Sequence, residues 1–165
     1  MSEKDVVISW LNDAYGMEKA LVQILEHQVK DAKDYPEVET RLQQHLEETR
    51  SHAELVQSAI ERLGGHTSTI KSGISSLFGQ MQVLSTGPAK DELVKNSLAD
   101  FAAEHFEIAS YRSLISAASE VNDQETVTVC RQILRDEEAM AEWLDRNIPV
   151  LTQATMRAMA GSPVA

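Results

Sequence analysis

Four glutamates stand inside the apolar stripes of four predicted helices: Glu18, Glu48, Glu104 and Glu137. Each stripe follows steps of three and four residues, the spacing that places side chains on one helix face. An ionised carboxylate taken out of water costs several kcal/mol unless positive charge meets it, and converging carboxylates also repel one another. No lysine or arginine lies on these stripes near the glutamates. A pair of bound divalent metal ions is therefore the simplest counter-charge.

Neighbouring residues extend this candidate metal site. A further glutamate stands three residues after Glu104, so both carboxylates face one centre. Two histidines flank Glu48 at spacings of three and four residues. Carboxylate and imidazole groups are the ligands that hold two metal ions inside four-helix bundles. We predict two iron or manganese ions and assign no catalytic residue; the predicted ligands are Glu18, Glu48, Glu104, Glu107, Glu137, His45 and His52.

The sequence departs from the usual ligand motif, which is Glu-x-x-His on two of the helices. The third residue after Glu48 is Ser51, and the third after Glu137 is Met140. The imidazoles are thus missing from their usual places. Each histidine of the predicted set is either a direct ligand or a hydrogen-bonded core residue. Any one glutamate is also compatible with a helix-edge residue that reaches solvent, but four stripes together favour a metal site.

Four helices of about 25 to 30 residues must position these side chains. We expect them over residues 3–31, 36–63, 88–120 and 123–147. Gly64 and Gly65 form a helix C-terminal signal. Residues 64–87, rich in Ser, Thr and Gly with an apolar thread, predict a long crossover that contains one short helix. Pro149 ends or kinks the last helix, and residues after it predict a short C-terminal tail helix.

One long connection between two helix hairpins is the ferritin-like arrangement of a four-helix bundle. We therefore predict an all-α, ferritin-like fold and a single domain over residues 1–165. Its parts are a core bundle over 3–148, the crossover over 64–87 and a tail over 149–165. A faint internal repeat supports two related hairpins, because residues 48–55 resemble residues 137–144. No alternating apolar run predicts a strand.

Composition narrows the classes of function. The chain has 165 residues and is 42% hydrophobic, enough for a buried core. Its net charge of −11 argues against nucleic acid or an anionic membrane as a partner. No apolar run approaches the roughly 20 residues that span a bilayer. The N-terminus lacks a signal-peptide pattern, and the single Cys130 excludes an internal disulfide. These features predict a cytoplasmic protein.

Longer stretches of the chain resemble the YciE/YciF-type ferritin-like proteins of bacteria, and most closely their YciE-like branch. The stretches that carry the resemblance are Trp10–Lys19, Tyr35–Glu37, His45–Thr49, Phe106–Tyr111, Asp136–Glu138 and Ala141–Pro149. They cover nearly the whole chain up to Pro149. The resemblance implies a ferritin-like bundle, a homodimer, a dimetal centre and a link to stress response.

Two hypotheses about function follow. In the first, the protein binds two iron or manganese ions and reacts with dioxygen or peroxide, as a ferroxidase or a peroxide-consuming oxidoreductase. Its substrate and redox partner are open, although oxygen-rich ligands favour iron or manganese over zinc or copper. In the second, it is a metal-free helical interaction or structural protein that has kept the bundle and lost the chemistry.

Overall fold

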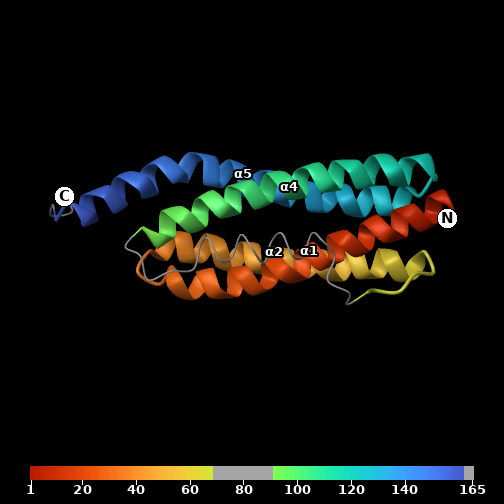
Figure 1. Cartoon of the computed structure of the whole chain (residues 1–165), viewed down its shortest axis with the longest axis horizontal. Helices are drawn as coiled ribbons and strands as arrows, with labels where there is room; N and C mark the ends of the chain where they lie inside the picture. Colours follow the sequence, from red (N-terminus) through yellow and green to blue (C-terminus); the bar gives the residue numbers. More distant parts are fainter. Residues whose placement is uncertain (69–90, 162–165) are drawn as a thin grey trace.

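The computed structural model describes residues 1–68 and 91–161, which form four α-helices. The helices are α1 (Glu3–Asp31), α2 (Pro36–Arg62), α4 (Glu92–Glu120) and α5 (Gln124–Met159). α1 and α2 form one hairpin, α4 and α5 form a second, and the two hairpins lie side by side (Figure 1). The predicted all-α four-helix bundle is confirmed. The short helix predicted in the crossover falls outside the described residues.

Local capping interactions fix three helix ends close to their predicted positions: the start of α1, the end of α2 and the start of α5. Ser2 Oγ accepts a hydrogen bond from the Asp5 backbone N–H at 3.2 Å, while the Asp5 carboxylate accepts one from the Ser2 N–H at 2.7 Å. After α2, Gly64 adopts a φ of +82°, the left-handed conformation that commonly ends a helix. Asp123 caps α5 by accepting a hydrogen bond from the Thr126 N–H at 3.3 Å.

Contacts between the hairpins set the register of α1 against α4. The Tyr111 hydroxyl donates a hydrogen bond to Glu18, and Gln28 Nε2 donates one to Asp100 Oδ1 at 2.8 Å. The partner number on α4 falls as the number on α1 rises, so these two helices run antiparallel. The antiparallel packing brings the predicted ligands in the middle of each helix to the same level of the bundle.

The C-terminal part of the chain differs from the prediction, because a separate tail helix is not seen. Instead α5 runs without interruption from Gln124 through Pro149 to Met159. Leu151 and Thr155 are one turn apart on α5 and both are buried, so packing holds the helical path beyond the proline. The end of α5 reaches beyond the other helices in Figure 1.

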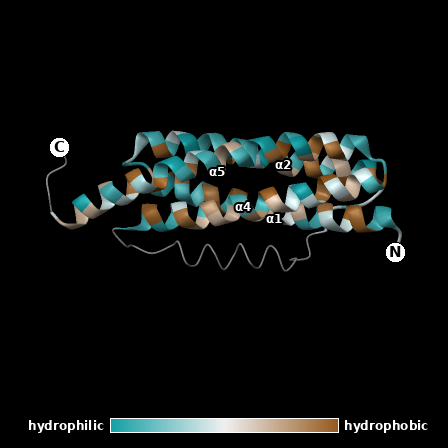
Figure 2. Cartoon of the chain, turned by 90° about the horizontal axis from the view of Figure 1, so that it is seen from above, coloured by the Kyte–Doolittle hydropathy of each residue, from teal (hydrophilic) through white to brown (hydrophobic). Residues whose placement is uncertain are grey.

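The apolar core consists of two clusters along the bundle axis. All four helices carry both hydrophobic and hydrophilic residues along their length (Figure 2). On α5, Ile133 belongs to one cluster and Met140 to the other, with Glu137 between them. On α2, His52 lies between Leu46 of one cluster and Val56 of the other. His52 and Glu137 thus lie between the two apolar clusters of the core.

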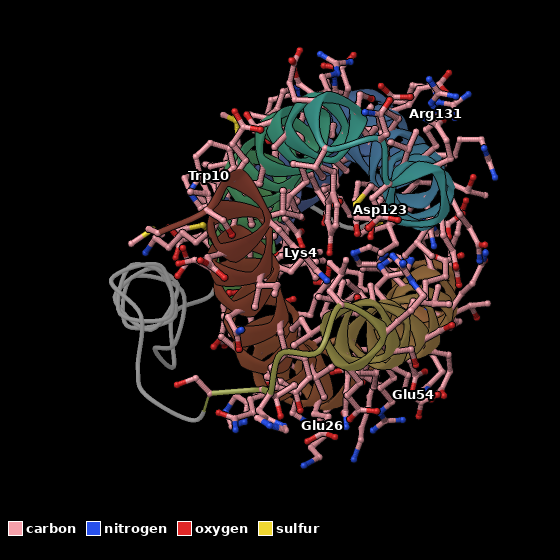
Figure 3. All side chains as sticks on the ribbon, turned by 90° about the vertical axis from the view of Figure 1, so that its right-hand side faces the viewer. Lys4, Trp10, Glu26, Glu54, Asp123 and Arg131 are labelled. Atoms are coloured by element: carbon pink, nitrogen blue, oxygen red, sulfur yellow. The ribbon has the colours of Figure 1, made fainter. Side chains whose placement is uncertain are left out.

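The outer surface carries the charged side chains, as Figure 3 shows for Glu26, Glu54 and Arg131 in a view along the bundle. Among the described residues, no helix is long and apolar enough to cross a membrane.

Candidate metal centre

Acidic and imidazole side chains from all four helices meet in the middle of the bundle. α1 contributes Glu18, α2 contributes two histidines, α4 contributes two glutamates and α5 contributes Glu137. Each of these six side chains is buried. Within them, two groups of three residues have ligand atoms that all lie within 4.8 Å of one another. The groups are Glu18, His52 and Glu137, and His45, Glu104 and Glu137.

The first group surrounds Nδ1 of His52. This nitrogen lies 2.9 Å from Glu137 Oε1 and 3.8 Å from Glu18 Oε2. His52 Nδ1, Glu137 Oε1 and Glu18 Oε2 nevertheless have no partner that meets hydrogen-bond geometry. Ligand atoms of Glu18, His52 and Glu137 lie close enough together to surround a single cation.

The second group surrounds Nε2 of His45. This nitrogen lies 3.0 Å from Glu104 Oε1 and 3.8 Å from Glu137 Oε2. The other Glu104 oxygen, Oε2, is buried without a hydrogen-bond partner. Glu137 therefore takes part in both groups through its two different oxygens. A carboxylate placed in this way can bridge two metal ions, which is its usual role in dimetal sites.

Glu107 and Tyr111 complete the centre from α4. Glu107 is buried and its Oε2 has no hydrogen-bond partner. It belongs to neither group of three, although its charge interacts with those of Glu137, Glu18 and Glu104. Tyr111 is fully buried and donates its hydroxyl hydrogen to Glu18 Oε1, which leaves Glu18 Oε2 directed at the first group. Glu107 is thus placed as a further carboxylate beside both groups.

Glu48 differs from the other predicted ligands. Its side chain is 22% exposed and lies in neither group. Its carboxylate accepts hydrogen bonds from Gln44 Nε2 at 2.7 Å and Arg41 Nη1 at 3.2 Å, so an arginine does reach this glutamate, contrary to the sequence expectation. It also lies 3.2 Å from Nδ1 of His45. Glu48 contacts the outer side of an imidazole rather than the centre.

Asp136 occupies the equivalent place behind the other imidazole, and the sequence analysis did not single it out. Its Oδ2 lies 3.1 Å from Nε2 of His52, and its side chain is 39% exposed. The one sequence feature that could have identified Asp136 is its position directly before Glu137. Adjacent residues point about 100° apart around a helix, so Asp136 lies off the apolar stripe that contains Glu137.

Both imidazoles come from α2. In the usual motif, two different helices each supply one histidine, three residues after a glutamate. His45 and His52 are seven residues apart, nearly two full turns, and therefore share one face of the helix. Ser51 is exposed on α2, and Met140 packs in an apolar cluster. One helix thus supplies an imidazole to each group of three.

Protons partly balance the charges of the centre. Burial alone would lower the pKa of His45, but the Glu104 and Glu48 carboxylates raise it to about 10. Burial alone would also lower the pKa of His52, but the Glu137 and Glu18 carboxylates raise it to about 11. Both rings therefore carry positive charge at neutral pH. In this protonation state the histidines stand in for part of the positive charge that the carboxylates require.

The carboxylates share the remaining charge unequally. Burial raises the pKa of Glu104 to about 8. Burial and the negative charge of Glu137 together raise the pKa of Glu107 well above the usual range. Burial would also raise the pKa of Glu137, but its contact with His52 and the charge of His45 hold it below the usual value. Cations that bind here would compete with protons for the two histidines and for Glu104.

The residues present fit a pair of divalent metal ions. The donors are carboxylate oxygens and two imidazole nitrogens, which suit iron or manganese. Buried oxygens of four glutamates lack hydrogen-bond partners, and such atoms are rare in folded proteins unless water or an ion meets them; they are Glu18 Oε2, Glu104 Oε2, Glu107 Oε2 and both oxygens of Glu137.

Residues 2–157 match the model of DUF892, a family described as a domain of unknown function. The chain belongs to the DUF892 family. The predicted YciE/YciF-type resemblance is thereby confirmed at the level of the family. A protein of Xanthomonas campestris pv. campestris with a solved structure is 34% identical to this chain. The two structures match with a TM-score of 0.83 over 96% of this chain and 99% of that chain.

More distant structures show the breadth of the fold. The Escherichia coli stress protein YciF is 21% identical to this DUF892 chain, with a TM-score of 0.80 over 93% of this chain and 98% of that one. A Desulfovibrio desulfuricans bacterioferritin with a diiron site is 24% identical, with a TM-score of 0.76 over 99% of this chain and 91% of that one. These similarities confirm the ferritin-like fold.

Proposed function

We propose that this DUF892 protein binds two divalent iron or manganese ions and uses them to react with dioxygen or peroxide. The observation that carries the proposal is the position of Glu137, whose two oxygens belong to two separate groups of buried ligands. One ion would be held by Glu18, His52 and Glu137. The second would be held by His45, Glu104 and Glu137. A metal pair of this kind supplies electrons and Lewis acidity for oxygen chemistry.

The protein's own residues would prepare that chemistry. Tyr111 fixes one oxygen of Glu18 by its hydrogen bond, so that the other oxygen keeps its direction. The apolar clusters on both sides exclude water from the centre. Glu107 places another carboxyl group beside the ligands, and burial raises its pKa well above the usual range.

Metal stoichiometry tests this proposal. Protein freed of metal by chelation should take up two Fe²⁺ ions per chain under anaerobic conditions, and two Mn²⁺ ions in a parallel titration. Glu137→Ala should lose both ions. Glu138→Ala is the matched control, because Glu138 is the next residue and pairs with Arg112 at the surface. Binding of less than one tenth of an ion per wild-type chain would contradict the proposal.

Peroxide consumption tests the reaction itself. Its rate should rise in proportion to the iron or manganese content of the protein and should fall to the level of free metal in Glu137→Ala. If metal binds but the rate does not follow metal content, the protein is a metal binder and the proposed reaction is wrong.

A metal-free structural role is the second candidate, and one observation favours it. Protonated histidines already lie within 3.0 Å of ionisable carboxylates, which gives the buried charges partners without any metal. Stability separates the candidates. In a metal-free structural protein, Glu104→Gln changes the unfolding free energy equally with and without added Mn²⁺. In a metal protein, the variant loses the extra stability that Mn²⁺ gives the wild type.

We also propose the homodimer that the family resemblance implies. Light scattering coupled to size-exclusion chromatography should give twice the chain mass of 18.3 kDa, and a mass of one chain would contradict it.

A further inference from the structure

Each imidazole of the centre has a carboxylate behind it that belongs to neither group of ligands. Nδ1 of His45 lies 3.2 Å from Glu48 Oε2, and Nε2 of His52 lies 3.1 Å from Asp136 Oδ2. Both carboxylates are partly exposed, whereas both rings are buried. The two rings therefore use opposite nitrogens: His45 faces the centre with Nε2, and His52 faces it with Nδ1.

The protonation pattern of a ring decides which nitrogen is able to bind a metal. A neutral imidazole carries one N–H and one lone pair, and only the nitrogen with the lone pair coordinates a cation. An ionised carboxylate accepts hydrogen bonds and donates none. A carboxylate behind the ring therefore keeps the N–H on the outer nitrogen and leaves the lone pair on the inner one.

The surroundings of Glu48 suit it to this task. Gln44 and Arg41 both donate hydrogen bonds to its carboxylate, one from each of the two preceding turns of α2. Because His45 lies on the same helix, its ring and Glu48 are held by one element. Asp136 instead reaches His52 from α5, so that contact depends on how α2 and α5 pack.

We propose that Glu48 and Asp136 are positioning residues that fix the two imidazoles in opposite tautomers. In this arrangement His45 would present Nε2, and His52 would present Nδ1, to the two metal ions. The inference rests on the proposed function, since it concerns the same metal centre. Glu48, predicted as a ligand, would then support His45 instead of binding metal itself, and Asp136 would do the same for His52.

Zinc is the probe for the first test, because Zn²⁺ is diamagnetic and binds both imidazole and carboxylate. Glu48→Ala and Asp136→Ala should each weaken Zn²⁺ binding by about 10- to 100-fold, the usual cost of removing a group that supports a ligand. Asp136→Asn should restore part of the loss, because its amide oxygen still accepts the ring N–H.

The chain offers a matched control beside each residue. Glu47 and Glu138 are neighbouring acids that pair with surface arginines, Arg50 and Arg112. Glu47→Ala and Glu138→Ala remove the same charge from the same parts of α2 and α5, so each should leave the Zn²⁺ dissociation constant within twofold of the wild type. Equal losses in the controls would show a general charge effect and would overturn the inference.

Nuclear magnetic resonance of the zinc-loaded wild type gives a readout that a purely structural ion pair would not produce. Long-range ¹H–¹⁵N spectra should show the proton of His45 on Nδ1 and that of His52 on Nε2. The same tautomer in both rings would overturn the inference, and this measurement decides even if an alanine variant fails to fold. If wild-type protein binds no Zn²⁺, Fe²⁺ or Mn²⁺, the proposed function fails as well. If it binds metal but the four alanine variants bind alike, only the present inference fails.

Discussion

Glu137 Oε1 lies 2.9 Å from Nδ1 of His52, although neither atom makes a regular hydrogen bond. The other oxygen of Glu137 lies 3.8 Å from Nε2 of His45. A single buried carboxylate on α5 thus lies between two histidines of α2. Glu137 is therefore the one residue that belongs to both groups of three. We predict that each of the other ligands binds only one of the two ions.

Glu18 and Glu104 should each control one ion. Glu104→Ala removes a ligand from the His45 group, so this variant should bind one Fe²⁺ with nearly wild-type affinity and the second at least about 10-fold more weakly. Glu18→Ala should give the same result for the His52 group. Calorimetric titration measures both sites. A variant that loses both ions, or neither, would show that the two groups are not separate positions.

Metal should stabilise the folded protein. A ligand that binds only the native state, at a free concentration 100 times its dissociation constant, adds about 2.7 kcal/mol per site. For a chain of this size each kcal/mol raises the melting temperature by about 2–4 °C. Calorimetry with Mn²⁺ should therefore show an increase of at least about 5 °C that EDTA reverses. The increase should be absent in Glu137→Ala and present in Glu138→Ala.

The metal-free protein should become less stable in alkaline solution. The pKa values of His45 and His52 are raised from 6.5 to about 10 and about 11. A raised pKa means that the folded state holds its proton more tightly than the unfolded state. The resulting stability is fully present below pH 6.5 and is lost as the pH rises through 10 to 11.

Urea unfolding between pH 6 and pH 10 checks this slope. His52→Gln should flatten the decline, although it should also lower stability near pH 6 by roughly 3–5 kcal/mol, because it leaves a buried carboxylate without its partner. His27→Gln, at an exposed histidine of α1, is the matched control. An unfolding free energy that rises between pH 7 and pH 10 would contradict the charge pattern derived for the centre.

Asp100 should destabilise the protein above neutral pH. Burial raises the pKa of its carboxyl to about 7, and the hydrogen bond from Gln28 and the charge of His45 offset this only in part. Because the folded pKa is raised, this group's contribution to stability is lost as the pH rises from about 4 to 7. Asp100→Asn should be more stable than the wild type at pH 8 by about 1–3 kcal/mol.

Thermal unfolding at pH 5 and pH 8 measures the effect of Asp100→Asn. The difference between variant and wild type should be larger at pH 8 than at pH 5. Asp145→Asn, at an exposed position of α5, should show no such difference. Equal effects of Asp100→Asn at both pH values would mean that the pKa of the Asp100 carboxyl is not raised in the folded state.

Helical periodicity was sufficient to predict the bundle and most of the buried carboxylates of the candidate centre. The stripes located Glu18, Glu104 and Glu137, and all three are buried in the structure. A stripe is wide, however, and it does not say which of several polar residues points to its centre. His45 and His52 differ by about 20° around the helix, whereas Glu48 lies about 60° from His45. That offset places Glu48 at the edge of the bundle.

Contacts between helices account for what the sequence could not predict. Asp136 meets His52 only because α5 packs against α2, and residues far apart in sequence carry no periodic signal for such a pair. The path of α5 beyond Pro149 also depends on packing, since buried Leu151 and Thr155 outweigh the local preference of proline to end a helix.

Diffraction from crystals soaked anaerobically in Fe²⁺, recorded at the iron absorption edge, tests the dimetal centre most directly. We expect two anomalous peaks, one on each side of Glu137: one beside Nδ1 of His52 and the other beside Nε2 of His45. The dimetal centre would be contradicted if crystals soaked in excess Fe²⁺ gave no anomalous signal at the centre, or gave peaks only beside surface carboxylates.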